Sequence, residues 1–187
     1  SGGVDSMVML DILNKLNFNI TVAHCNFKLR GIESDEETFF LQSYLNEHNI
    51  KHEIIFFDTE NYAKINKLSI QLAARELRYN WFDNLLVQLN LNYTITAHHL
   101  DDQAETFLIN FTRGTGLDGL LGIPSKNNNI IRPFLTCSRD EILKYAQQNN
   151  VPWREDSSNL SSKYFRNKIR HKVIPILKEL NPDFLKT

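Results

Sequence analysis

The chain has 187 residues, of which 42% are hydrophobic and 23% are charged, and its formal net charge at pH 7 is −1. This composition suffices for one sizeable core and excludes both an intrinsically disordered chain and a generally basic nucleic-acid coat protein. No apolar run approaches the roughly 18 residues of a membrane span, and no signal peptide is visible, so no membrane partner is expected.

The predicted elements begin with the glycine-containing stretch SGGVDS (1–6), which a helix with a mixed apolar face follows. Further along, Ser34-x-x-Glu37 and Ser138-x-x-Glu141 are interpreted as capping boxes that open two helices. Strands are expected at 19–25, 52–57, 93–97 and 129–134, and helices at 34–47, 69–89, 102–111, 138–150 and 164–180, the last broken by Pro175.

Strands that alternate with helices predict an α/β fold with a parallel sheet covered by helices on both faces. A loop such as SGGVDS normally follows a buried strand, so we expect that the first strand of a Rossmann-like, doubly wound sheet is missing before Ser1. Ligands of such sheets bind beyond the carboxyl ends of the strands. The segments 1–6, 24–31 and 98–105 are therefore expected around one cleft.

The cysteines Cys25 and Cys137 stand alone, without a CxxC pair. Isolated thiols fit a reducing compartment and argue against a zinc or iron–sulfur site with cysteine ligands. We expect a cytoplasmic protein in which both thiols are packed.

The stretch SGGVDS has two glycines that let the backbone close on an anion, two hydroxyl donors and one carboxylate. It lacks the lysine that serves γ-phosphoryl transfer in GxxxxGK[ST] loops. An acid without that lysine suits a polyphosphate held together with Mg²⁺, with the metal bridging the phosphate and Asp5. The alternative is an ordinary Gly-Gly turn capped by Asp5 or Ser6.

The same stretch resembles the pyrophosphate loop of the N-type ATP pyrophosphatases, the PP-loop superfamily. Within that superfamily, six segments that occur in order resemble the tRNA(Ile)-lysidine synthases, and they extend the resemblance from Ser1 to about Pro175. They are AHCNFKLRGIESDEE (23–37), AARELRYNWF (73–82), AHHLDDQAETFLINFTRGTGLDGL (97–120), IRPFL (131–135), VPWREDSSN (151–159) and YFRNKIRHKVIP (164–175).

The resemblance implies a tRNA-modifying ligase that uses ATP and Mg²⁺. It would adenylate the C2 carbonyl of the wobble cytidine in tRNA(Ile) with a CAU anticodon, release pyrophosphate, and let free L-lysine expel AMP to give lysidine. It also implies that residues 1–187 form an N-terminal catalytic domain. The segment from about 160 to 187 would be a basic helical segment leading to tRNA-binding domains absent from this chain.

The resemblance assigns the ATP site to the phosphate loop, to His24 and Arg30 at and beyond the end of the first predicted strand, and to the RGTG stretch. Where the family usually has a second histidine after that strand, this chain has Phe27. Gly114 has an alternative explanation as a helix C-cap. The ATP-site candidates are Ser1, Gly2, Gly3, Val4, Asp5, Ser6, His24, Arg30, Arg113 and Gly114, with Asp5 also the candidate ligand of Mg²⁺.

The candidate catalytic residues are Asp5, His98, Asp102 and Glu105. Asp102 and Glu105 stand three apart at the start of a helix, so their carboxylates can converge on one point. Such a pair could hold the ammonium group of lysine and then accept its proton, because only the neutral amine is a nucleophile. The alternative is an N-cap followed by an acidic N3 residue.

Four arginines are candidate tRNA contacts. Arg75 and Arg78 lie three apart on one predicted helix, and the alternative for them is a solvated pair beside Glu76. Arg166 and Arg170 lie four apart in a segment, 163–187, with seven basic and two acidic side chains. With Tyr164 and Phe165 beside them for stacking, they are predicted to face tRNA or the ATP phosphates, the alternative being a solvated helix face.

Two other functions stay open. One is another PP-loop enzyme, such as a tRNA thiolase or an amidotransferase-type synthetase; thiolases generally need a catalytic cysteine or a CxxC cluster, which Cys25 and Cys137 do not supply. The other is a non-catalytic nucleotide-binding module of the universal-stress-protein kind, sharing the fold only. That function would not explain the carboxylates or the basic segment. The sequence predicts no oligomeric state.

Overall fold

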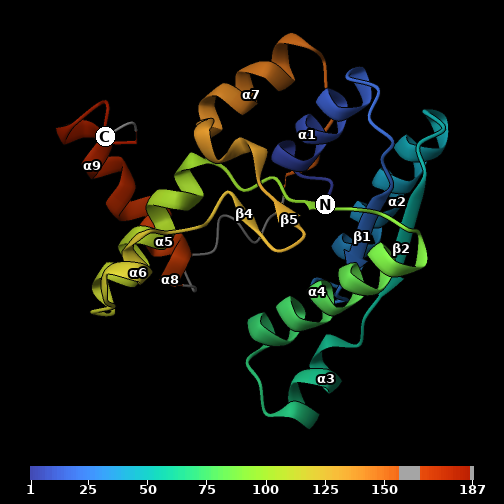
Figure 1. Ribbon diagram of the computed structural model, residues 1–187, viewed down its shortest axis with the longest axis horizontal. Coiled ribbons are helices and arrows are strands. Elements are labelled where there is room, and N and C mark those ends of the chain that lie inside the picture. The colour runs from blue at the N-terminus through green and yellow to red at the C-terminus, as the bar shows by residue number, and fades with distance from the viewer. Residues whose placement is uncertain (156–164, 186–187) are drawn as a thin grey trace. The chain divides into compact units, whose positions relative to one another are not determined.

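The computed structural model describes residues 1–155 and 165–185 (Figure 1). The backbone divides into two compact units. The first comprises residues 1–2 and 9–94, and the second comprises residues 3–8 together with the chain from residue 95 onward. Helix α1 (Val4–Lys15) directly follows the first three residues and contributes residues to both units.

The first unit contains a β–α–β arrangement. Strands β1 (Val22–Asn26) and β2 (His52–Phe56) pair in parallel, and helix α2 (Ile32–Glu47) connects them. Parallel neighbours need such a crossover, because a tight turn can join only antiparallel strands. Helices α3 (Thr59–Asn66) and α4 (Ile70–Gln88) complete the unit. This parallel pair lies where the sequence predicts two strands of a parallel sheet.

The second unit is mostly helical. Its sheet has the order β3-β5-β4, and β4 and β5 form an antiparallel hairpin. Within the described residues, no helix is both long and apolar enough to cross a membrane. The elements are β3 (Thr94–Ile95), α5 (Leu100–Thr112), α6 (Leu117–Leu120), β4 (Lys126–Asn127), β5 (Ile130–Ile131), the 3₁₀ helix η1 (Pro133–Thr136), α7 (Arg139–Gln148), α8 (Phe165–Lys168), the π-helical turn η3 (Ile169–Val173) and α9 (Ile174–Leu180).

Several predicted elements differ from the structure. The strand expected at 93–97 is reduced to the two residues of β3, and helices α3 and α6 lie where no helix is predicted. The strand expected at 129–134 is reduced to β5, because the positive φ of Asn128 (49°) turns the chain back into a hairpin and Pro133 opens a 3₁₀ helix. The capping box at Ser34 and Glu37 is wrong. Helix α2 begins two residues earlier, at Ile32, and Ser34 is buried within its first turn, where its hydroxyl accepts the N–H of Arg30 at 3.2 Å.

The second predicted capping box is confirmed. The Ser138 hydroxyl accepts the N–H of Glu141 at 3.2 Å, and the Glu141 carboxylate accepts the N–H of Ser138 at 2.8 Å. Each bond satisfies a backbone donor that the start of a helix leaves without a partner. This fixes the start of α7, and the next N–H along the chain, that of Arg139, reaches the carboxylates described below.

Candidate active site

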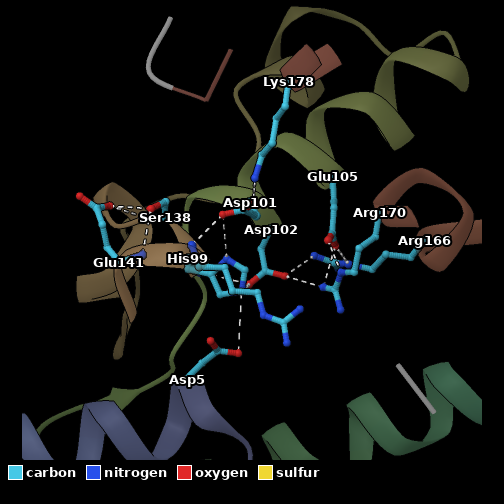
Figure 2. Close-up of polar contacts among 11 residues, drawn as sticks. Asp5, His99, Asp101, Asp102, Glu105, Ser138, Glu141, Arg166, Arg170 and Lys178 are labelled. Atoms are coloured by element: carbon cyan, nitrogen blue, oxygen red, sulfur yellow. Dashed lines mark hydrogen bonds and ion pairs between the residues drawn. The ribbon is translucent and has the colours of Figure 1, made fainter. Parts of the chain in front are cut away.

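Three carboxylates gather at the beginning of α5 (Figure 2). Asp101 and Asp102 lie in the first turn, and Glu105 follows one turn later; all three are buried, and Glu105 has no exposed surface. The residue before the helix, His99, is its N-cap, and its backbone N–H donates to Asp102 at 3.1 Å. The N-terminus of a helix favours negative charge, but three buried acids also need cationic partners.

Arginines from the C-terminal segment supply those partners for Glu105. Its Oε2 accepts hydrogen bonds from Nε of Arg166 at 2.6 Å and from Nη2 of Arg170 at 3.1 Å, and its Oε1 accepts one from Nε of Arg170 at 2.5 Å. Burial acts to lower the pKa of Arg170, but its hydrogen bond to Glu105 and the attraction of Glu105, Asp102 and Asp5 together outweigh burial, and the pKa is raised. The Arg170–Glu105 pair is therefore a charge-assisted, two-point contact.

The same guanidinium groups reach Asp102. Its Oδ1 lies 3.1 Å from Nη2 of Arg166 and 3.4 Å from Nη2 of Arg170, while its Oδ2 accepts the N–H of His99. Asp102 and Glu105 do converge, as their spacing predicts. In this structure, however, what they share is a pair of guanidinium groups. The alternative, in which Asp102 is the N-cap and Glu105 the N3 residue, is wrong. His99 is the N-cap of α5, and Asp102 occupies the third helical position.

The local helix geometry brings the two arginines to one point. Arg166 lies on α8, and Arg170 lies in the π-helical turn that follows it. Pro175 has no N–H to donate to the carbonyl four residues earlier, which accounts for irregular helical bonding just before it. The chain stays helical through Pro175 into α9 instead of ending there. Ile169 and Ile174 are buried, which seats this segment in the second unit.

The third acid, Asp101, has separate partners. Nζ of Lys178 on α9 donates to its Oδ1 at 2.7 Å, and the N–H of Arg139 donates to its Oδ2 at 2.8 Å. Burial acts to raise the pKa of Asp101, but these two hydrogen bonds, together with the attraction of Lys178 and His99, outweigh burial and the pKa is lowered. Three basic side chains of the C-terminal segment thus pair with the acids of α5, a role that the sequence did not predict for them.

Asp5 joins this cluster from the first turn of α1. Its Oδ2 lies 3.8 Å from Nε2 of His99, and that nitrogen lies 3.5 Å from Asp102. Burial raises the pKa of Asp5, and the attraction of His99 and Arg139 only partly opposes this effect. Its Oδ1 is buried and has no hydrogen-bond partner in the part of the chain that the structure describes. A buried carboxylate oxygen without a donor is suited to a cation.

The histidine among the carboxylates is His99, which is only 3% exposed, whereas the sequence singles out His98. The ring of His98 instead lies against the hydroxyl of Thr96, with its Nδ1 at 2.9 Å. The two neighbours cannot be told apart by residue type. The signal that the sequence did hold was the spacing of His99 and Asp102, which is that of an N-cap and its N3 residue.

In the first unit, the candidate ATP-site residues form a second network around Glu37. Its Oε1 accepts the N–H of Gly2 at 3.0 Å, and its Oε2 pairs with the guanidinium of Arg30. His24 is buried, and its Nε2 lies 2.9 Å from the hydroxyl of Thr38. Burial, reinforced by the positive charge of Arg30, lowers the pKa of His24 to about 4. His24 is therefore neutral at pH 7.

Both arginines of α4 lie over aromatic rings of the first unit. The guanidinium carbon of Arg78 is 5.1 Å from the ring centre of Phe27, and that of Arg75 is 4.8 Å from the ring centre of Tyr79. Phe27 also stacks on Phe57, with ring centres 5.7 Å apart. Phe27, the position of the second histidine in the resemblance, is therefore a stacking partner of Arg78. Cation–π contact holds both guanidinium groups in place.

The RGTG stretch closes helix α5. Gly114 has a φ of +69°, its N–H donates to Phe111, and the N–H of Thr115 donates to Asn110. This pattern of bonds is a Schellman motif, in which glycine is favoured because an L side chain strains that backbone. The C-cap alternative therefore accounts for Gly114. Arg113, the C-cap residue, is exposed, and an ATP contact by either residue stays a prediction.

Residues 1–177 match the protein family described as the PP-loop domain. The chain belongs to the PP-loop domain family. Curated relatives named tRNA(Ile)-lysidine synthase include those of Porphyromonas gingivalis (46% identity over 97% of this chain and 40% of the relative), Thermosipho africanus (45%, 98% and 44%) and Bacillus subtilis (38%, 98% and 40%). This PP-loop chain thus spans less than half the length of these relatives.

Among solved structures, the PP-loop chain is similar to the U34-tRNA thiolase NcsA from Methanococcus maripaludis with its [4Fe-4S] cluster. The TM-score is 0.78 at 20% sequence identity, over all of this chain and 66% of that one. The likeness concerns the fold. Together with the family match, it confirms the Rossmann-like α/β class that the sequence predicts, and the curated relatives confirm the resemblance to tRNA(Ile)-lysidine synthases.

Proposed function

We propose that this PP-loop domain is the catalytic domain of a tRNA(Ile)-lysidine synthase. In the first step, the C2 oxygen of the wobble cytidine attacks the α-phosphorus of ATP, and pyrophosphate leaves. In the second, the ε-amine of free lysine attacks C2, loses a proton, and AMP leaves with the C2 oxygen. Adenylation makes that oxygen part of a good leaving group, so two accessible steps replace one difficult step.

The observation that carries the proposal is the match to lysidine synthases along nearly the whole chain. The relative from Porphyromonas gingivalis is 46% identical over 97% of this chain. A tRNA thiolase is the less favoured alternative. Its thiol chemistry would fall to Cys25 or Cys137, and burial raises the pKa of the Cys25 thiol to about 11, which disfavours the reactive thiolate.

Mg²⁺ would be held by Asp5 together with the phosphates of ATP. The fit rests on Oδ1 of Asp5, a buried hard oxygen without a donor among the described residues. No group of three or more metal-binding side chains occurs in residues 1–155 and 165–185, so Asp5 would share the ion with the substrate. When bound, Mg²⁺ would supply positive charge to the polyphosphate. The Ser1–Ser6 loop and the N-terminus of α1 would orient that polyphosphate.

Lysine would bind at Asp102 and Glu105, and its ammonium group must then replace a guanidinium group. Arg166 is the better candidate to give way, because its side chain is 41% exposed while that of Arg170 is 22% exposed. Asp102 keeps some exposure, whereas Glu105 has none, so Asp102 is the more accessible acceptor for the proton that the amine loses. Released from the acids, Arg166 could contact a phosphate of tRNA or ATP.

The remaining assignments follow the same proposal. His24, Arg30, Arg113 and Gly114 would line the nucleotide, His98 would lie beside the reacting groups, and Arg75 and Arg78 would contact tRNA. A tRNA substrate and two isolated cysteines fit a cytoplasmic enzyme.

The test is a product assay on the full-length protein. Pyrophosphate release is measured with tRNA(Ile) that has a CAU anticodon, with ATP and Mg²⁺, and with lysine or a sulfur donor. We expect release that needs this tRNA, and lysidine in the digested product only when lysine is added. A matched tRNA with a CAU anticodon but methionine identity should give no product. Sulfur-dependent thiolation would favour the thiolase, and absence of any release would favour a nucleotide-binding module.

A further inference from the structure

Glu37 joins two groups of the proposed ATP site. One of its carboxylate oxygens accepts the N–H of Gly2, in the phosphate loop, at 3.0 Å. The other pairs with the guanidinium of Arg30. The capping role expected for Glu37 is absent from α2, so the structure leaves this carboxylate with no function in helix formation.

The helix that carries Glu37 is firmly anchored. The buried side-chain amide nitrogen of Asn26, at the end of β1, lies within hydrogen-bond distance of the carbonyl of Ser34 (3.2 Å), of Asp35 (2.9 Å) and of Thr38 (3.0 Å). These three residues flank Glu37 on the first turns of α2. A side chain on such a support presents its carboxylate in a well-defined direction.

Gly2 is held closely at the other end of the contact. A Cβ atom at Gly2 would lie 3.3 Å from the Phe40 ring and 3.4 Å from Cγ of Glu37, so this backbone packs tightly on α2. Arg30 is held at its backbone as well, because its N–H donates to the Ser34 hydroxyl. Gly2 and Arg30 therefore meet at a single carboxylate.

We propose that Glu37 is a positioning residue for ATP, one that fixes the start of the phosphate loop and aligns the Arg30 guanidinium beside it. The inference rests on the proposed function only in taking this loop as the ATP site. A charge-assisted bond to Gly2 fixes the peptide N–H at the start of the loop. Arg30 carries a planar guanidinium, whose orientation is set by its pairing with Glu37.

The test compares Glu37→Gln with Glu36→Gln, which removes the same charge from an exposed neighbouring position of α2. ATP is titrated into the full-length protein by calorimetry. We expect the Kd for ATP to rise about tenfold in Glu37→Gln and less than twofold in Glu36→Gln. In turnover, the KM for ATP should rise by the same factor while the KM for tRNA and kcat are kept, a separation that a general packing defect would not give.

A second pair of variants keeps the inference testable if Glu37→Gln folds poorly. Glu37→Asp retains the charge but is one methylene shorter, so it can reach only one of its two partners, and a rise of about threefold in Kd is expected. Combining Arg30→Gln with Glu37→Asp should cost less than the sum of the two single losses, because both variants disturb the Arg30–Glu37 pair. Unchanged or tighter ATP binding in the Glu37 variants, or fully additive losses, would overturn the inference. Failure of the unaltered protein to bind ATP would overturn the proposed function as well.

Discussion

Arg170 holds both carboxylate oxygens of Glu105, with its Nε 2.5 Å from Oε1 and its Nη2 3.1 Å from Oε2 (Figure 2). Glu105 has no exposed surface, so this contact compensates a fully buried charge. Removing one partner of such a pair costs far more than the pair contributes over an apolar replacement, because the remaining charge stays buried alone. The stability of the second unit should therefore depend strongly on Arg170.

Arg170→Ala is expected to lower the free energy of unfolding by about 3 kcal/mol. Arg166→Ala should cost only about 1 kcal/mol, because Arg166 is more exposed and Arg170 still neutralises Glu105. Urea unfolding at pH 7 measures both values. Lys172→Ala is the matched control, since Lys172 is an exposed cation of the same segment, and it should change stability by less than about 0.5 kcal/mol. Equal losses in the two arginine variants would contradict this ranking.

Asp5→Asn should abolish pyrophosphate release while making the folded protein more stable at pH 7. Burial raises the pKa of Asp5, so the folded state holds its proton more tightly than the unfolded state. Ionising Asp5 above that pKa therefore opposes folding, and asparagine removes this cost. Thermal unfolding at pH 7, set beside the pyrophosphate assay, checks both effects. An inactive variant with a lower Tm would indicate that Asp5 has a structural role.

The chain's α/β order and the approach of Asp5 to the acids of α5 could be predicted, because both follow from local periodicity and from topology. The carboxylate partners of Arg166 and Arg170 could not be predicted from the sequence. Their spacing shows only that they share a helix face, and either a phosphate or a carboxylate satisfies a guanidinium group. The partner was decided by tertiary packing of residues more than 60 positions away along the chain.

The contacts of Glu37 could not be predicted from the sequence either, although its partners lie closer along the chain. Its sequence pattern fits a capping box, yet Gly31, with a φ of 53°, is the N-cap of α2, and Ser34 and Glu37 make other bonds. Ser138 and Glu141 have the same pattern and do form the box. The difference lies in what surrounds the helix start, because Glu37 can reach an arginine and a loop N–H. Local sequence alone does not contain that information.

Arg166→Ala should lower the KM for lysine if the ammonium group of lysine has to replace Arg166 at Asp102 and Glu105. Without Arg166, one hydrogen bond at each carboxylate is available in advance, and a fall of about threefold to tenfold is expected, with tRNA-dependent adenylation preserved. Steady-state rates at varied lysine measure this effect. Lys168→Ala, from an exposed position of α8, is the control. A higher KM for lysine would mean that Arg166 contacts the amino acid directly.

The buried His24 should make stability depend on pH below neutrality. Its pKa is about 4 in the folded protein and about 6.5 in an unfolded chain, so between these values only the unfolded state binds the proton. The stability contributed by neutral His24 is complete above pH 6.5 and is lost as the pH falls towards 4. The loss reaches about 3 kcal/mol.

Urea unfolding between pH 7 and pH 4 should show this slope, and His24→Gln should remove it. Exposed His48 provides the control, because His48→Gln should leave the slope in place. An unchanged slope in His24→Gln would assign the pH dependence to other groups.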